Sequence, residues 1–294
     1  MSKSQFFLLA ALAGLAAASC SKSSSSSPAA LAPVTVTVGN YVTSMDPMDT
    51  KVMNITDAGS PVKSVTLAFF DASGNEVFKQ TQTKADATEE APFGVFSCQL
   101  HVGTHTMVVV GRGPGNDEEF ELISPTSAGY TSDLVRETFS AEKSVTVTSA
   151  GPNNFTATLD RVVAKLFILS TDGKLPEAQT VRITMSKGGK YFNPSTGLAT
   201  TNTGYVREVS AGNNNYQYSA SLTFLFLGTD ELTMDITLEV LDANSQVITT
   251  HTLQDVPFKR NCATNLSGPL FSADASASAF LVNDLWGTPS NIEF

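Results

Sequence analysis

A strict alternation of apolar and polar side chains over residues 232–240 constrains the fold of this chain more than any other feature. Apolar side chains fill every second position there: Leu232, Met234, Ile236, Leu238 and Val240. A period of two buries one face of an extended strand and exposes the other. Residues 34–38 and 65–69 repeat the pattern. The continuous apolar runs 107–110 and 166–169 predict strands covered on both faces.

Turn-forming residues separate these predicted strands. Residues 65–75 and 236–246 resemble each other, since each is a strand followed by a hairpin that begins Asp-Ala. With the polar stretch 149–154, this echo predicts two β domains that meet near residue 155. Many short antiparallel strands favour sandwiches, because one open sheet would leave a large face and its edges exposed. One short helix is expected over about 131–142.

The first twenty residues read as a bacterial lipoprotein export signal. Lys3 precedes an apolar run, 6–18, that is too short to span a bilayer. The segment Leu15–Cys20 resembles a lipobox, in which Cys20 is acylated and becomes the mature N-terminus. An ordinary signal peptide cut near Ala18 is the alternative.

These features predict the organisation of the whole chain. We expect a signal peptide at 1–19, a Ser/Ala/Pro tether at 20–33, an N-terminal sandwich at 34–154 and a C-terminal sandwich at 155–294. Several acyl chains on Cys20 would hold the protein at a membrane, because one chain alone binds only marginally.

Composition limits the partners. Without residues 1–19 the chain keeps 17 basic and 28 acidic residues, a net charge of −11. This balance argues against nucleic acid as a main partner, because no basic patch exists to release counterions. Cys98 and Cys262 lie in opposite halves, so two buried thiols are favoured over a disulfide.

No motif predicts a catalytic residue, a cofactor or a metal. Cys98, His101 and His105 lack the spacing of a structural zinc site, and Gly103 predicts a turn between the two histidines. The acidic run 117–119 follows a glycine-rich segment and makes a poor phosphate cradle. Calcium binding there is an alternative, but solvated loop acids are favoured.

Other candidate residues are single side chains. His251 has no Ser and Asp at triad-like spacing nearby. Tyr216, Tyr218 and Trp286 could stack on sugars, although core or cross-strand packing is the favoured use. Residues 279–286 alternate loosely and predict either a donor strand or an edge of the chain's own sheet.

The order of segments resembles the fimbrillin-like lipoproteins of Bacteroidetes, which include stem, tip and anchor subunits of surface pili. The segments that carry the resemblance are Val65–Phe78, Leu100–Val110, Leu159–Leu166, Leu175–Pro176, Val256–Gly268 and Leu270–Phe271. Cys262 departs from the pattern, because the family more often has an aromatic residue there. The resemblance implies an all-β fold of two tandem transthyretin-like antiparallel β-sandwich domains.

Family membership would imply assembly by strand addition, in which a partner's extended strand completes an open sheet. In stem subunits an Arg-specific protease removes the first strand. No arginine occurs here between Cys20 and Arg112. The sequence therefore predicts a subunit that keeps its lipid and its first strand, as an anchor does.

The resulting hypothesis is a lipid-anchored structural subunit of a surface fimbria, an anchor or accessory subunit, located at the cell outer membrane. Its partners would be other fimbrial subunits and the outer membrane through Cys20; a host or bacterial surface ligand is left open. The alternative is an outer-membrane surface glycan-binding lipoprotein. A hydrolase with scattered acids is the least favoured alternative.

Overall fold

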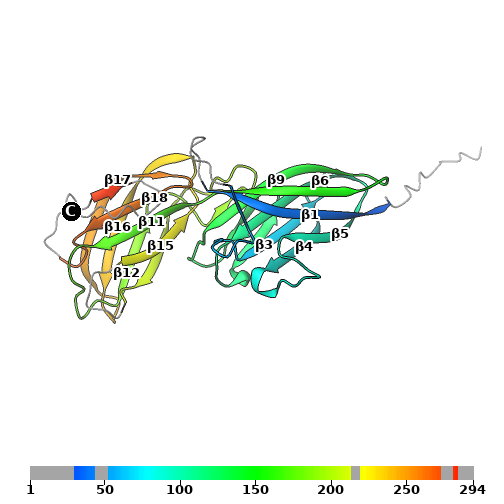
Figure 1. Cartoon of the computed structure of the whole chain (residues 1–294). Coiled ribbons are helices and arrows are strands. Elements are labelled where there is room, and N and C mark those ends of the chain that lie inside the picture. Colours follow the sequence, from blue (N-terminus) through cyan, green and yellow to red (C-terminus); the bar gives the residue numbers. More distant parts are fainter. Residues whose placement is uncertain (1–29, 44–51, 213–218, 273–280, 284–294) are drawn as a thin grey trace, which may run out of the picture.

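The structure, a computed structural model, describes residues 30–43, 52–212, 219–272 and 281–283. In this part of the chain almost every regular element is a strand, which confirms the predicted all-β fold. Figure 1 shows an elongated molecule with an N-terminal half and a C-terminal half joined end to end. None of the described helices is long and apolar enough to cross a membrane.

Eight strands build the first half: β1 (Leu31–Val42), β2 (Val52–Asn54), β3 (Ser64–Phe70), β4 (Glu76–Thr83), β5 (Val95–His101), β6 (Gly103–Arg112), β9 (Thr138–Val147) and β10 (Asn153–Arg161). One layer has the order β5–β1–β10, with β2 beside the end of β1, and the other has the order β9–β6–β3–β4. The layers join where Asp160 and Arg161 of β10 pair with Ser140 and Phe139 of β9.

Side chains that alternate along these strands fill the space between the two layers. Val34, Val36 and Val38 of β1 face Leu67 of β3 and Val109 of β6, and all five are at most 2% exposed. Burial of such a side chain contributes about 1.5–3 kcal/mol. The alternation in the sequence therefore gives the sandwich its core.

The second half contains β11 (Ala164–Ser170), β12 (Thr180–Met185), β14 (Tyr205–Ser210), β15 (Ser219–Leu225), β16 (Glu231–Leu241), β17 (Val247–Lys259), β18 (Ala263–Gly268) and β19 (Leu281–Asn283). Its layers have the orders β15–β11–β18–β19 and β14–β12–β16–β17. The core between them includes Ile183, Ile236 and Leu266, all at most 1% exposed.

The two halves share one seven-strand topology. In chain order, β1, β3, β4, β5, β6, β9 and β10 correspond to β11, β12, β14, β15, β16, β17 and β18. In each half the first strand runs parallel to the seventh, β1 with β10 and β11 with β18. The two halves are therefore alike at the level of sheet order.

The two similar sequence segments form hairpins at positions that do not correspond in the two halves. Residues 65–75 form β3 and its turn, whereas residues 236–246 form β16 and its turn, and β16 corresponds to β6. The turns are alike because Asp71 accepts the backbone N–H groups of Ser73 and Asn75, and Asp242 does the same for Asn244 and Gln246. Turn chemistry, and not descent from one repeat, explains the likeness.

A third core joins the two halves. A small sheet of β7 (Phe120–Ser124), β8 (Ser127–Tyr130) and β13 (Tyr191–Phe192) combines strands from both parts of the sequence. Side chains of this sheet pack with others of both halves in one buried cluster: Ala68, Phe70, Val108, Val110, Leu122, Ala128, Tyr130, Val135, Val162, Val163, Phe192, Phe224 and Phe226. Gly129 permits the close approach of β13, because a Cβ there would lie 2.5 Å from the Lys190 carbonyl oxygen.

The joint core explains the two continuous apolar runs. Met107 and Val109 point into the first sandwich, while Val108 and Val110 point into the joint core, so this strand is covered on both faces as predicted. At 166–169 the prediction is half right, because Phe167 is only partly buried. The chain passes from a sheet of the first half to a sheet of the second half at Val162–Val163, between β10 and β11. We propose the domain division there. A division near residue 155 would cut β10.

Two local predictions were wrong. The expected helix at 131–142 is absent: residues 131–137 form a loop, and β9 begins at Thr138. Residues 139 and 140 instead pair with both β6 and β10, which offers more backbone partners than one isolated helical turn. The expected tether to residue 33 is also too long, because β1 begins at Leu31 and pairs with His101.

Candidate functional site

The predicted lipidation residue, Cys20, lies outside the described residues, as do Tyr216, Tyr218 and Trp286. The structure therefore says nothing of their surroundings. Of the predicted tail strand 279–286, residues 281–283 are described, and they form β19 at the edge of the chain's own sheet beside β18. The candidate feature considered among the described residues is the first strand, β1.

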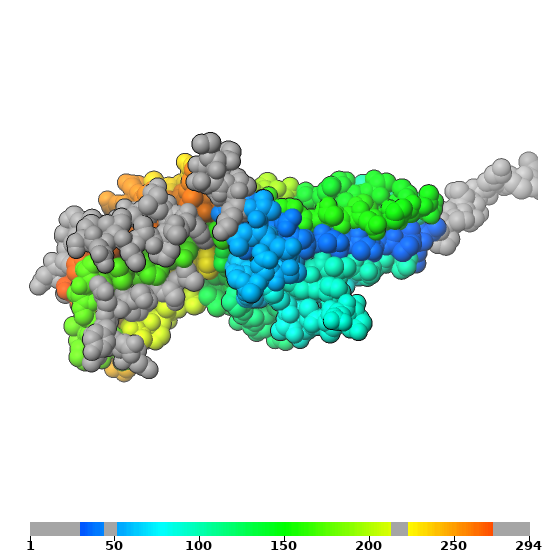
Figure 2. All heavy atoms as spheres, in the orientation of Figure 1, coloured from blue at the N-terminus to red at the C-terminus, as the bar shows by residue number. Residues whose placement is uncertain are grey.

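β1 is an interior strand of its layer, with strand partners on both sides. Residues 34–42 pair in parallel with β10, and on the opposite side residues 31–37 pair with β5 and residues 40–42 with β2. In Figure 2 β1 is the blue band that lies between the green of β10 and the cyan of β5. A strand with partners along both sides leaves no vacant position for a second strand in this place.

The inward face of β1 belongs to the hydrophobic core. Ala32, Val34, Val36, Val38 and Tyr41 are each at most 4% exposed. The ring of Tyr41 also meets that of Phe139 edge to face, with 5.0 Å between centroids. Loss of β1 would expose a long apolar groove between β10 and β5, which is the kind of site that strand addition uses.

The direction of β1 places its first residue, Leu31. Figure 1 shows that β1 begins at the end of the molecule farthest from the second half and runs toward the joint. Leu31 therefore lies at the outer end of the first sandwich.

Arginine is absent from β1 and from everything between Cys20 and Arg112. Arg112 itself lies at the end of β6 and is 1% exposed. In the described chain Arg136 and Arg161 are buried as well. No arginine therefore lies between Cys20 and β1, and the first arginine after β1 is enclosed.

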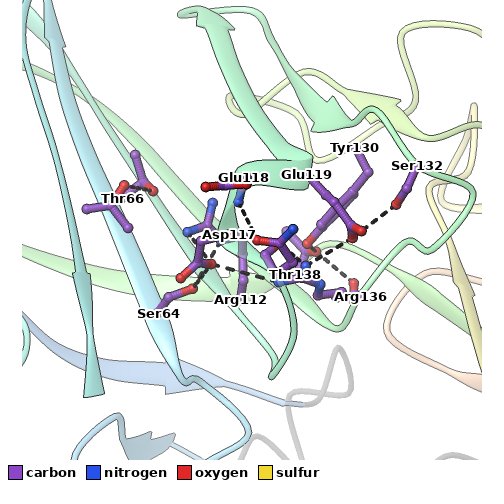
Figure 3. A network of polar contacts seen from close by, with 12 residues as sticks. Ser64, Thr66, Arg112, Asp117, Glu118, Glu119, Tyr130, Ser132, Arg136 and Thr138 are labelled. Carbon is purple, nitrogen blue, oxygen red and sulfur yellow. Dashed lines mark hydrogen bonds and ion pairs between the residues drawn. The ribbon is translucent and has the colours of Figure 1, made fainter. Parts of the chain in front are cut away.

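Two of these buried arginines, Arg112 and Arg136, belong to a polar network that Figure 3 shows from close by. Arg112 lies 2.9 Å from the Asp117 carboxylate, donates to Ser64 Oγ at 3.2 Å and stacks 4.1 Å above the Phe120 ring. Ser64 in turn donates to Asp117 at 2.8 Å. Burial lowers the pKa of Arg112, and Asp117 opposes that shift.

Arg136 extends this network to the loop 113–119. It lies 3.2 Å from the Glu119 carboxylate and also donates to the backbone carbonyl of Asn116. Beside it, the hydroxyl of Tyr130 bonds to Thr138 at 2.8 Å, and burial raises the pKa of Tyr130 to about 12. The loop is therefore held against the joint core by charge-assisted contacts.

Sequence reasoning missed this network. It treated residues 117–119 as solvated acids with calcium as the alternative, whereas Asp117 and Glu119 are partners of buried arginines. Across the described residues no cluster of His, Cys, Asp and Glu is arranged to hold a metal ion. An Arg at the end of an otherwise apolar strand, followed by acids at 117 and 119, was the signal that could have revealed the pairing.

The cysteines, the histidines and Gly103, which the sequence analysis considered, lie in ordinary structural positions. Cys98 and Cys262 are two separate thiols, half-buried rather than buried, and desolvation raises the pKa of Cys98 to about 11. His105 Nε2 lies 2.8 Å from the His101 carbonyl oxygen, and His251 Nε2 lies 3.0 Å from that of Leu270. Gly103 has a φ of 144° where β5 gives way to β6, as predicted.

An open hollow lies over the β16–β17 pair, lined by Glu231, Leu232, Thr233, Pro257, Phe258 and Lys259. Its two charged residues pair with each other, since Lys259 Nζ lies 2.7 Å from Glu231. The two charges at this hollow therefore neutralise each other.

Two solved structures resemble this chain in fold. A proposed adhesin from Bacteroides ovatus matches with a TM-score of 0.51 and 12% identity, over 88% of this chain and 94% of that one. A second proposed adhesin, from B. ovatus ATCC 8483, matches with a TM-score of 0.50 and 11% identity, over 76% and 83%. The predicted resemblance to fimbrillin-like proteins is confirmed at the level of the fold.

The chain belongs to the family of unknown function DUF6562, which it matches over residues 65–281. The fimbrial anchor protein Mfa2 from Porphyromonas gingivalis aligns with a TM-score of 0.48 and 10% identity, over 87% of this chain and 97% of Mfa2. No curated protein matches this chain in sequence.

Proposed function

We propose that this chain is a structural subunit of a bacterial surface fimbria, anchored in the outer membrane by lipid on Cys20. It acts through contacts with other fimbrial subunits, as an anchor or accessory subunit that retains its first strand. The proposal assigns it no enzymatic activity. The two proposed adhesins of similar fold support a role at the cell surface.

One observation carries the proposal: β1 pairs along both sides, and no arginine precedes it after Cys20. A stem subunit of the fimbrillin type would give up this strand by Arg-specific cleavage. In the proposed role the strand stays in its own core, so the chain is suited to begin or end an assembly, and not to propagate it.

Mass spectrometry of the protein on cells tests the retained strand. We expect a mature N-terminus at an acylated Cys20. A mature N-terminus beyond Val38 would overturn the proposal, because β1 would then have been removed.

A Cys20→Ser variant tests the anchor. We expect it to leave the membrane fraction, since the acyl chains provide the attachment. Cys98→Ser is the matched control, because this half-buried thiol lies within β5 and its replacement should leave the attachment unchanged. Soluble glycan binding lost on substitution of Tyr216 or Tyr218, in cells without fimbriae, would favour the glycan-binding alternative.

A further inference from the structure

Among the described strands, the outer edge of β10 is open where its counterpart in the second half is covered. On one side β10 pairs with β1 along Asn153–Asp160. On the other side the pairs recorded for the described strands are confined to Asp160 and Arg161. Residues 153–159 therefore present backbone N–H and C=O groups along an unpaired edge.

The second half shows what this position accepts. β18 corresponds to β10, and its outer edge carries β19, which pairs antiparallel with residues 265–267. The seam between the seventh strand and its neighbouring layer therefore has room for an additional antiparallel strand. In the first half only Val162 and Val163 separate β10 from β11, so the chain cannot turn back to fill the seam itself.

The open edge lacks the usual protection against pairing. Residues 153–159 read Asn-Asn-Phe-Thr-Ala-Thr-Leu and contain no charge and no proline. Other edge strands carry such residues, for example Lys79 in β4, Glu208 in β14 and Pro257 in β17. Charges and proline discourage the addition of a strand at an edge.

We propose that this edge binds the same edge of a second copy of the chain, with the two β10 strands antiparallel about a two-fold axis at Thr156. The sequence is self-complementary in this register: Thr156 faces Thr156, Asn154 faces Thr158, Phe155 faces Ala157 and Asn153 faces Leu159. No like charges meet, and the central pairs are polar with polar or apolar with apolar, which favours cross-strand pairing. Because the two strands are antiparallel and related by the axis, the N–H groups along each open edge meet C=O groups of the other copy, and the reverse.

The geometry sets the orientation of the two copies in such a dimer. β10 runs parallel to β1, and β1 begins at the outer end of the first half. Antiparallel β10 strands therefore point the two β1 strands in opposite directions, with the two Leu31 residues at opposite ends of the contact. With each copy anchored through Cys20, as proposed above, a contact of this kind joins copies from two facing surfaces.

Disulfide trapping tests the register, with the mature chain carrying Cys20→Ser. Thr156→Cys should form a covalent dimer on mild oxidation, because each new thiol faces its own symmetry mate. Asn154→Cys should not, because it faces Thr158, and the double variant Asn154→Cys, Thr158→Cys should form the dimer again. Trapping that is equal at all positions, or absent from all of them, would overturn the proposal.

Sedimentation equilibrium measures the association itself. Thr156→Lys places two ammonium groups opposite each other and should weaken the dimer by about fivefold or more. Gln80→Lys, an exposed position on β4, is the matched control and should leave the dissociation constant unchanged. A monomer at every concentration would refute the dimer, and lipid attachment measured in parallel keeps that result separate from the anchor proposal.

Discussion

The two halves of this protein share one strand order but manage their edges differently. In the second half β19 covers the outer edge of β18, while in the first half no described strand pairs with the corresponding edge of β10 over residues 153–159. In the first half β5 and β2 complete the other side of β1. A common topology therefore fixes the core, whereas additional strands decide which edges are available to a partner.

The halves also differ in their polar content near the joint. Arg112, Arg136 and Arg161 all come from the first half, and each is buried against a carboxylate. In the second half Arg182 and Arg260 also pair with acids, but with more of their side chains in solvent. Burial of a paired charge costs desolvation energy, so the first half depends more strongly on each partner.

The joint core provides the largest test of whether the halves are one unit. Phe226 is fully buried and stacks on Phe192 with 4.3 Å between ring centroids. Phe226→Ala should lower the free energy of unfolding by about 3–5 kcal/mol, because it leaves a cavity shared by both halves. We expect one cooperative transition in urea to move to lower concentration. If only one of two separate transitions moved, the halves would be independent.

Removal of a buried arginine's partner should have the next largest effect. Asp117→Ala leaves the guanidinium of Arg112 buried without its carboxylate and should cost about 3 kcal/mol by urea denaturation. Asp133→Ala removes an exposed partner of Lys190 and should cost less than about 1 kcal/mol. Equal losses would mean that burial does not distinguish these pairs.

High pH should destabilise the protein through Tyr130. Burial raises the pKa of this tyrosine from 10.0 to about 12, so the folded state keeps a proton that the unfolded state releases. Its contribution is complete below pH 10 and declines as the pH rises toward 12, by about 2 kcal/mol at pH 11.5. Stability measured against pH should fall less steeply in Tyr130→Phe. An unchanged slope would show that Tyr130 does not carry the effect.

The smallest effect is expected from substitutions in the two similar hairpins. Gly74 has a φ of 81° and Ser245 a φ of 60° at corresponding places in their turns. Left-handed backbone is unfavourable for residues with a Cβ, so Gly74→Ser should destabilise by about 1 kcal/mol and Ser245→Gly should stabilise by a smaller amount. A Cβ at Gly74 has open space, so sterics would not obscure the result. Thermal unfolding midpoints that shift in the same direction would contradict this explanation.

The sequence alone determined the strand periodicity, the sandwich class and the cover on both faces of residues 107–110, because alternation records burial directly. Tertiary structure decided the rest. The three-residue β19, the joint core and the pairing of Arg112 with Asp117 depend on segments that fold together from distant or locally irregular sequence. The failed helix at 131–142 has the same cause: Phe139 and Ser140 gain backbone partners on two strands, and local propensity cannot reveal contacts that arise only when the layers meet.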